Sequence, residues 1–173
     1  MIKAFTDGSS KGNGKKNCLA GCGVYYPNGI TSGENKPVSI SMQLSEAIKE
    51  VKYNGSLNNT NNTGELMAIL LALYCITQKE TDLMIYSDSM YCINSIVIWS
   101  KGWIKNGWIA STGSPVKNKE IIQRILEERK KFKNVAFIHV KAHRKAPPKD
   151  SEDYLIWYGN DQADHLATNS VHA

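Results

Sequence analysis

The sequence predicts an α/β fold, in which helices flank a five-stranded mixed sheet with strands 1–3 antiparallel and strands 4 and 5 parallel to strand 1. Two apolar segments, at residues 2–7 and 83–88, each end in an aspartate, and an apolar helical pattern from residue 60 to 76 separates them. This order of strand, helix and strand implies a right-handed parallel crossover, which places the first and fourth strands side by side. We expect one domain spanning residues 1–173.

The first strand is the segment around which the chain is organised. Residues 2–10 predict a short strand that ends in a single carboxylate, Asp7, before a loop of lysines, glycines and one asparagine at residues 11–16. On its own, Asp7-Gly8 is most simply a turn between strands. An acid that faces a loop rich in amides and cations also suits metal or phosphate chemistry, provided that other segments supply partners for Asp7.

Charge and composition narrow the class of partner. The chain carries a formal net charge of +5, with 42% hydrophobic and 21% charged residues, which is ordinary for a globular protein. A basic balance favours an acidic partner, and nucleic acid is the commonest one. We expect no membrane span, because no apolar run reaches eighteen residues, and no secretory leader, because the chain enters a strand at once. We expect a monomer with no obligatory protein partner.

The cysteines indicate a reducing compartment. Cys18, Cys22, Cys75 and Cys92 form neither a Cys-x-x-Cys pair nor a zinc-ligand spacing. Buried free thiols in an intracellular protein are the simplest account, in the cytoplasm or in a eukaryotic nucleus or organelle. A bridge between Cys18 and Cys22 remains the alternative.

The N-terminal half predicts a hairpin and two helices. Residues 19–26 form an apolar strand, residues 27–29 (Pro-Asn-Gly) signal a turn, and residues 30–34 are expected to return as the third strand. Apolar residues at helical spacing predict a short amphipathic helix over 42–52. Thr60 is a candidate cap for the next helix, which is apolar nearly all round and is therefore expected to be central and buried.

The C-terminal half continues with a helix from Ser89 and a segment in which three tryptophans lie within residues 99–108. Residues 117–133 predict a helix with a basic far end, residues 135–140 a fifth strand, and residues 158–168 the last helix. We expect Trp108 to belong to the core.

Four carboxylates occupy comparable places. Asp7 and Asp88 end adjacent parallel strands, Glu65 lies in the first turns of the intervening helix, and Asp164 lies on the last helix. If they meet, each pair about 4 Å apart repels by roughly 4 kcal/mol at an effective dielectric near 20. Such a cluster requires divalent cations, and hard oxygen ligands favour magnesium or manganese over zinc. Two such ions can activate a water and stabilise the leaving oxygen in phosphodiester hydrolysis.

An ordered set of motifs resembles the type 1 ribonuclease H family and covers most of the chain. The matching residues, in family order, are Phe5-Thr6-Asp7-Gly8-Ser9, Gly12-Asn13, Thr60-Asn61-Asn62-x-x-Glu65-Leu66, Ser87-Asp88-Ser89, Trp99, Trp103-x-x-x-Gly107-Trp108, Asn118, Val140-Lys141-x-His143 and Asn160-x-x-x-Asp164-x-Leu166-Ala167. No single piece decides the matter, but the ordered set is highly specific.

The resemblance implies a ribonuclease H-like fold and an endonuclease that cuts the RNA strand of RNA–DNA hybrids with two Mg²⁺ ions, or Mn²⁺ as a substitute, leaving 5′-phosphate and 3′-hydroxyl ends. The implied metal ligands are the four acids, with Asp7 shared by both ions. The Asn-x-x-x-Asp-x-Leu-Ala register selects Asp164 over Asp161 as the fourth acid. His143 matches a loop histidine that assists proton transfer and product release, although without the motif it would be an ordinary exposed histidine.

The resemblance also divides substrate recognition between two grooves. Asn13, Asn61 and Asn62 match residues that reach the minor-groove edges and 2′-hydroxyls of the RNA strand. Thr60 and Asn118 match a pocket for a DNA phosphate. The DNA-strand channel is matched by Tyr91, Trp99 and Trp103, although ordinary core packing also explains tryptophans at such positions. Lys101 and Lys105 are expected to follow the phosphate backbone.

The chain departs from the family pattern at several points. Ile104 stands where some relatives carry a cation, so lysines 11, 15 and 16 or the basic run 129–133 could share that work. Two segments, near 40–58 and 144–158, are longer than usual, and the second is expected to lengthen the loop before the last helix. It carries Arg144, Trp157 and other basic and aromatic residues. Two roles are open for it: it shapes the product side or contacts the substrate, or it is an ordered lid without contact. We expect the hybrid-binding module that some relatives carry to be absent.

Two other functions remain open. The first is a different nuclease on the same fold, such as a junction resolvase or a structure-specific exonuclease. The second is a hybrid-binding protein without catalytic activity, against which the presence of all four acids argues.

Overall fold

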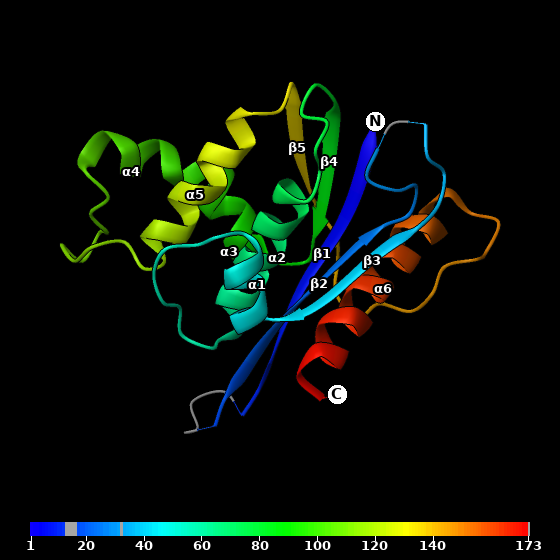
Figure 1. Ribbon diagram of the computed structural model, residues 1–173, viewed down its shortest axis with the longest axis horizontal. Helices are drawn as coiled ribbons and strands as arrows, with labels where there is room; N and C mark the ends of the chain where they lie inside the picture. Colours follow the sequence, from blue (N-terminus) through cyan, green and yellow to red (C-terminus); the bar gives the residue numbers. More distant parts are fainter. Residues whose placement is uncertain (13–16, 32, 173) are drawn as a thin grey trace.

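The computed structural model describes residues 1–12, 17–31 and 33–172. One sheet contains the strands β1 (Ile2–Lys11), β2 (Leu19–Tyr26), β3 (Val38–Gln43), β4 (Asp82–Ser87) and β5 (Asn134–His139), in the order β3-β2-β1-β4-β5 (Figure 1). The helices are α1 (Leu44–Glu50), α2 (Asn61–Tyr74), α3 (Met90–Ile93), the π-helical η1 (Asn94–Trp99), α4 (Ser100–Asn106), α5 (Lys119–Lys130) and α6 (Glu152–His172).

The strand directions confirm the predicted fold class. The first three strands pair antiparallel, β4 pairs parallel to β1, and β5 pairs parallel to β4. The parallel pairing of β1 with β4 is the predicted crossover through α2. Asp7 therefore belongs to a strand at the centre of the sheet, and the strand carrying Asp88 at its end is the immediate neighbour.

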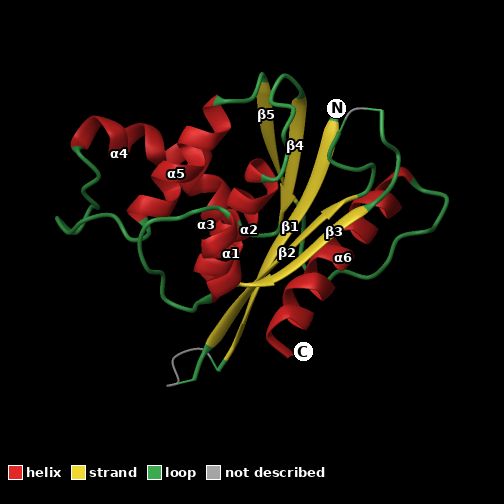
Figure 2. Ribbon diagram, viewed as in Figure 1, coloured by secondary structure: helices red, strands yellow, loops and turns green. Residues whose placement is uncertain are grey.

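Helices cover both faces of the sheet. Helix α6 lies along one face, across β1, β2 and β3, and the other helices lie on the opposite side, with α2 against β1 and β2 (Figure 2). Each face has its own buried cluster. The larger surrounds α2, which is buried along nearly its whole length as predicted, and the smaller lies under α6 with Phe5 stacked on Tyr86 at 4.4 Å between ring centroids. Because β1 is covered on both faces, four of its five residues before Asp7 are buried: Ile2, Ala4, Phe5 and Thr6, whereas Lys3 is exposed.

Gly8 permits a close contact between β1 and α2. A Cβ atom on Gly8 would lie 2.2 Å from the backbone nitrogen of Glu65 and 2.5 Å from the carbonyl carbon of Gly64. The expected Asp7-Gly8 turn was therefore wrong: both residues lie within β1, which continues to Lys11 and pairs there with Leu19 of β2. The glycine is required by close packing between backbone segments.

The third strand was predicted in the wrong place. The Pro-Asn-Gly turn forms, with the N–H of Gly29 donating to the carbonyl of Tyr26 (3.3 Å). Of the predicted strand at 30–34, the structure describes residues 30, 31, 33 and 34, and none of these four is in a strand. The strand is β3, at Val38–Gln43, whose alternate residues Val38, Ile40 and Met42 pack against the core. This period-2 pattern is visible in the sequence, but Val38 and Ile40 lie between the predicted strand and the predicted helix, and Met42 falls inside that helix. The helix begins at Leu44 rather than at residue 42.

The last helix is longer than the predicted 158–168. It begins at Glu152 and ends at His172, so the segment 144–158 is a loop only as far as residue 151. The indole N–H of Trp157 donates to the carbonyl of Arg144 (3.0 Å), and the Arg144 guanidinium bonds the Asp153 carboxylate, which ties the loop to the first turns of α6. The segment 40–58 likewise contains the end of β3 and all of α1.

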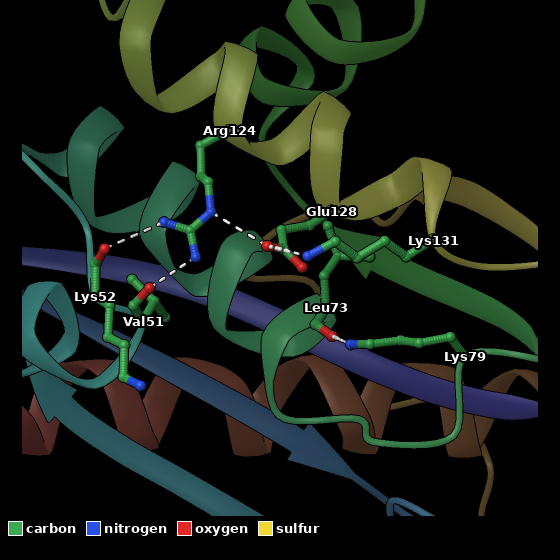
Figure 3. A network of polar contacts seen from close by, with 7 residues as sticks. All are labelled: Val51, Lys52, Leu73, Lys79, Arg124, Glu128 and Lys131. Atoms are coloured by element: carbon green, nitrogen blue, oxygen red, sulfur yellow. Dashed lines mark hydrogen bonds and ion pairs between the residues drawn. The ribbon is translucent and has the colours of Figure 1, made fainter.

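A polar network fixes α1 and α5 to one another (Figure 3). The Arg124 guanidinium donates to the carbonyl of Val51 at the end of α1 (2.7 Å) and to Glu128 Oε1 (3.2 Å), and Lys131 Nζ donates to the same oxygen (3.0 Å). Beside them, Lys79 Nζ donates to the carbonyl of Leu73 at the end of α2 (2.9 Å). These cations satisfy carbonyl groups that a helix C-terminus leaves without partners.

The predicted thiol state holds: all four cysteines are free, with Cys22 and Cys92 buried and Cys18 and Cys75 partly buried. Among the helices of the described ranges, none is both long and apolar enough to cross a bilayer.

Candidate active site

Three acids from three elements lie together on one side of the sheet centre. Oxygens of Asp7, Glu65 and Asp88 all lie within 4.8 Å of one another. The parallel pairing of β1 with β4 ends at Thr6 and Ser87, so Asp7 and Asp88 each follow the last paired residue of neighbouring strands. Glu65 comes from the second turn of α2, which the close contact at Gly8 holds against β1.

Local hydrogen bonds fix the backbone around each acid. The N–H of Gly8 donates to Asp7 Oδ1 (2.9 Å). On either side of Asp88, the N–H of Ser89 donates to Ser87 Oγ (3.1 Å), and Ser89 Oγ accepts from the N–H of Cys92 (3.2 Å) as the N-cap of α3. The acid thus stands at a strand-to-helix junction with little freedom, as a preorganised ligand requires.

Burial raises the pKa of all three carboxyl groups. Desolvation is the largest cause for Asp7, followed by the negative charge of Glu65 and then that of Asp88. Burial likewise raises the pKa of Glu65, and burial followed by the charge of Asp164 raises the pKa of Asp88, against the influence of His143 and His139. These shifts express the cost of placing several negative charges in one buried site without a cation.

The donor set fits a hard divalent cation. The ligand atoms offered are all carboxylate oxygens, which Mg²⁺ and Mn²⁺ prefer. Glu65 is 8% exposed, and its Oε2 has no hydrogen-bond partner among the described residues. A buried carboxylate oxygen without a donor is costly for the protein alone, and a cation would satisfy it.

Asp164 stands at the edge of this cluster rather than inside it. It is not one of the three acids whose oxygens lie within 4.8 Å of one another, but it lines a cleft together with Asp88 and His143. Asp161, the alternative fourth acid, lines the same cleft and lies 3.5 Å from His165 Nε2. Asp164 raises the pKa of Asp88 through its charge and that of Asp7 through a side-chain hydrogen bond, so its carboxyl group adjoins the cluster.

The start of α2 carries two residues predicted for the RNA strand, Asn61 and Asn62, and one predicted for the DNA-phosphate pocket, Thr60. Thr60 is its N-cap in a capping box, in which Thr60 Oγ1 accepts from the N–H of Thr63 (3.1 Å). Asn61 and Asn62 follow and are exposed, one turn before Glu65. Asn13, Lys15 and Lys16 lie outside the described residues.

Aromatic side chains form a continuous row on the α3–α4 side. Centroids of Tyr91 and Trp99 are 6.2 Å apart, those of Trp99 and Trp103 are 6.0 Å apart, and those of Trp103 and Trp108 are 5.7 Å apart. Exposure falls from Trp99 to Trp108: Trp99 is 43% exposed, whereas Trp108 is 9% exposed and belongs to the core as predicted. The row therefore presents one aromatic face to solvent and anchors the other end in the protein.

Comparisons with known proteins identify the family. A model of the RNase H family matches residues 1–172. The chain belongs to the RNase H family. It is 39% identical over 163 residues to a ribonuclease H of Schizosaccharomyces pombe, covering 94% of this chain and 50% of that protein. It is 32% identical over 139 residues to a ribonuclease H of Saccharopolyspora erythraea, covering 80% of this chain and 90% of that one.

The fold is shared with solved structures. One is a foamy viral protease-reverse transcriptase in complex with an RNA/DNA hybrid, with a TM-score of 0.69 and 17% identity over 98% of this chain and 20% of that chain. The chain spans about half the length of the curated relatives that it matches from Schizosaccharomyces pombe, rat, mouse and human.

In this RNase H chain, the basic residues fall into two groups. Lys101 and Lys105 are exposed on α4, on either side of an exposed Ile104. Much of the run at residues 129–133 is structural instead. The Arg129 guanidinium lies over the ring of Phe137 at 5.3 Å, and Lys131 bonds the buried Glu128.

Four residues without a predicted role line the cleft together with Asp88 and Asp164: Lys141, Arg144, Trp157 and Asn160. The sequence carries one signal for Asn160: it precedes Asp164 by four residues, which places both on one face of a helix. For Arg144 and Trp157 the sequence leaves open whether their segment meets the substrate, and the fold brings both residues to the cleft.

Proposed function

We propose that this chain is a metal-dependent endoribonuclease that hydrolyses the RNA strand of RNA–DNA hybrids. The observation that carries the proposal is the cluster of Asp7, Glu65 and Asp88 at the sheet centre, in a chain of the RNase H family. Relatives named ribonuclease H, and a structural neighbour solved with a hybrid, support the substrate class. The products would carry 5′-phosphate and 3′-hydroxyl ends.

Asp7, Glu65, Asp88 and Asp164 would hold two divalent cations, which we propose are Mg²⁺, with Asp7 shared between them. When bound, such ions neutralise charge on the scissile phosphate, activate the attacking water and stabilise the leaving oxygen. The chain contributes the fixed positions: the strand junction orients Asp7 and Asp88, and α2 supplies the unpartnered Glu65 Oε2. Because the acids are placed before substrate arrives, little reorganisation accompanies the reaction.

His143 is placed to exchange protons at the cleft. It is exposed, it has a left-handed backbone conformation (φ 53°), and it shares the cleft with Asp88 and Asp164. A histidine changes charge near neutral pH, so it can accept a proton close to the reacting phosphate and release it to solvent. The exposed loop suits that exchange, because solvent reaches the imidazole directly.

The two strands of the hybrid would lie on either side of the cluster. Asn61 and Asn62, exposed at the start of α2, face the position of the RNA strand and would read its 2′-hydroxyls. The solvent face of Trp99 and Trp103 would pack on deoxyribose of the DNA strand, and Thr60 and Asn118 would hold a DNA phosphate. Lys101 and Lys105 would add contacts to the phosphate backbone.

We also propose that the chain acts as a monomer inside the cell. The free state of its four cysteines supports a reducing compartment.

Cleavage of four labelled substrates with Mg²⁺ tests the function: an RNA–DNA hybrid, the matching duplex RNA, the matching duplex DNA and a four-way junction. We expect only the RNA of the hybrid to be cut, and Asp88→Asn to abolish cutting while an exposed control, Asp150→Asn, retains it. Cutting of the junction without the hybrid would assign a resolvase instead. Tight hybrid binding without metal-dependent cutting would assign a binding protein.

A further inference from the structure

The cleft beside the carboxylates has one wall that belongs to the long segment at residues 144–158. Arg144 and Trp157 of this segment line the cleft together with Asp88, Asp164 and Lys141. The wall is held in place, since the indole N–H of Trp157 donates to the carbonyl of Arg144 (3.0 Å) and Arg144 is ion-paired with Asp153. This segment therefore shapes a surface next to the reacting groups rather than a distant loop.

Asn160 lies in this cleft with an unmet hydrogen bond. Its side chain is 8% exposed, it stands one helical turn before Asp164 on α6, and its Oδ1 has no hydrogen-bond partner among the described residues. Buried polar atoms normally have partners, and one without a partner calls for an explanation. A cleft that opens toward a substrate explains the missing partner, because the bound ligand would supply the hydrogen-bond donor.

The groups around Asn160 restrict what that donor is. Asp88, Asp161 and Asp164 offer only acceptors when ionised. Lys141, His143 and Arg144 line the same cleft and carry N–H donors, but none of them donates to Asn160 Oδ1 in the described part of the chain. On the ligand side, phosphate oxygens accept and do not donate. The 2′-hydroxyl is the one donor on the sugar–phosphate backbone of RNA, and deoxyribose lacks it.

We propose that this cleft is a subsite for one ribonucleotide next to the cut bond, in which Asn160 Oδ1 accepts a hydrogen bond from the ribose 2′-hydroxyl. Lys141, exposed at the cleft, faces the adjoining phosphate, and Trp157 forms the wall beside the sugar. Asn160 is thereby a residue that distinguishes ribose from deoxyribose, in addition to the exposed asparagines that begin α2. This inference rests on the proposed function, because it concerns the same substrate.

Single-sugar substitution tests the contact. In a set of hybrids, one RNA residue at a time is replaced by its 2′-deoxy counterpart, and kcat/KM is measured for wild type and Asn160→Ala at each cut bond. We expect Asn160→Ala to lower kcat/KM about tenfold, the size of one hydrogen bond. The ratio of the wild-type kcat/KM to that of Asn160→Ala should fall to about one when the deoxy sugar stands at one fixed offset from the cut bond. The control is Asn169→Ala, an exposed asparagine on the same helix, which should match wild type throughout.

Two results would overturn the proposal. A ratio that stays the same at every offset would assign Asn160 to a water or a cation rather than to a sugar. A ratio of one on the unmodified hybrid would remove Asn160 from recognition. Melting of Asn160→Ala should match wild type within a few degrees, since no bond is lost in the free protein; if that variant does not fold, Asn160→Ser takes its place.

Binding measurements separate this inference from the proposed function. The affinities of Asp7→Asn and Asp7→Asn/Asn160→Ala for the same hybrids are compared without any need for cleavage. A loss of affinity that disappears at one deoxy position supports the subsite even if wild type cuts no hybrid. Equal affinities of the two proteins for every hybrid would contradict it.

Discussion

Asn118 Nδ2 donates a hydrogen bond to Tyr91 Oη (3.1 Å). Asn118 is the N-cap of α5 in a left-handed conformation (φ 62°), and Tyr91 lies in α3, in edge contact with Trp99. The two residues belong to the proposed phosphate pocket and the proposed DNA-strand channel, respectively. One hydrogen bond thus couples the geometry of the two proposed contacts with DNA.

Removal of the tyrosine hydroxyl tests that coupling. We expect Tyr91→Phe to raise KM for hybrid severalfold with little change in kcat, because Asn118 loses the bond that orients its amide while the acids are unaffected. Steady-state kinetics on one hybrid measure both constants. Tyr74→Phe is a suitable control, since Tyr74 ends α2 with the Arg124 guanidinium over its ring, away from this pair. A fall in kcat alone would contradict the assignment.

Replacement of Asp7 separates catalysis from stability. We expect Asp7→Asn to abolish hybrid cleavage while its melting temperature in metal-free buffer equals or exceeds that of wild type. Asparagine keeps the Oδ1 that accepts from Gly8 and removes one charge from a buried cluster. Calorimetry with a chelator measures the second effect. A clear loss of melting temperature would show that the three acids do not repel one another.

Divalent cations should stabilise the folded protein. Binding to the native state alone adds RT ln(1 + [L]/Kd), about 2.7 kcal/mol at one hundred times Kd, which is several degrees in melting temperature for a chain of this size. We expect millimolar Mg²⁺ to raise the melting temperature of wild type and a chelator to reverse the rise. Asp7→Asn should show little of this gain. An equal rise in both proteins would point to binding elsewhere.

The raised carboxyl pKa values predict an unusual pH dependence. A carboxyl group whose pKa is raised by folding favours the native state fully below its unfolded pKa, near 4, and this contribution is lost as the pH rises toward the folded value. In metal-free buffer, wild type should therefore lose stability relative to Asp7→Asn as the pH rises from about 4 to 8. Melting curves of both proteins across that range provide the test. A difference that stays constant with pH would exclude a raised pKa for Asp7.

In the network between α1 and α5, Arg124 should contribute more to the free energy of unfolding than Lys131. We expect Arg124→Ala to lower the free energy of unfolding by about 1–3 kcal/mol, because the Val51 carbonyl and the buried Glu128 each lose a charged donor. Lys131→Ala should cost less than about 1 kcal/mol, since that side chain is 56% exposed. Urea denaturation of both variants measures the difference, and equal losses would contradict the ranking.

The sequence located most elements because their signals are local. Thr60 lies at the start of α2 with its hydroxyl bound to the N–H of Thr63, as a capping residue should. The period of apolar residues identified β2, α2 and β4 to within a residue or two. It failed at Val38–Gln43 and at Glu152–Trp157, where β3 and the start of α6 depend on pairing with β2 and on bonds from Arg144, which are contacts with distant parts of the chain.

For the site, the sequence by itself determined the acids and the strands that carry Asp7 and Asp88, because strand ends and parallel order follow from pattern and chirality. Only the tertiary structure decided their distances, the position of Asp164 at the edge of the cluster, and the cleft wall that brings Asn160 and Arg144 beside it. The physical reason is close packing. Gly8 allows the backbone of α2 to approach β1, and no local pattern records how near two segments fifty-seven residues apart will come.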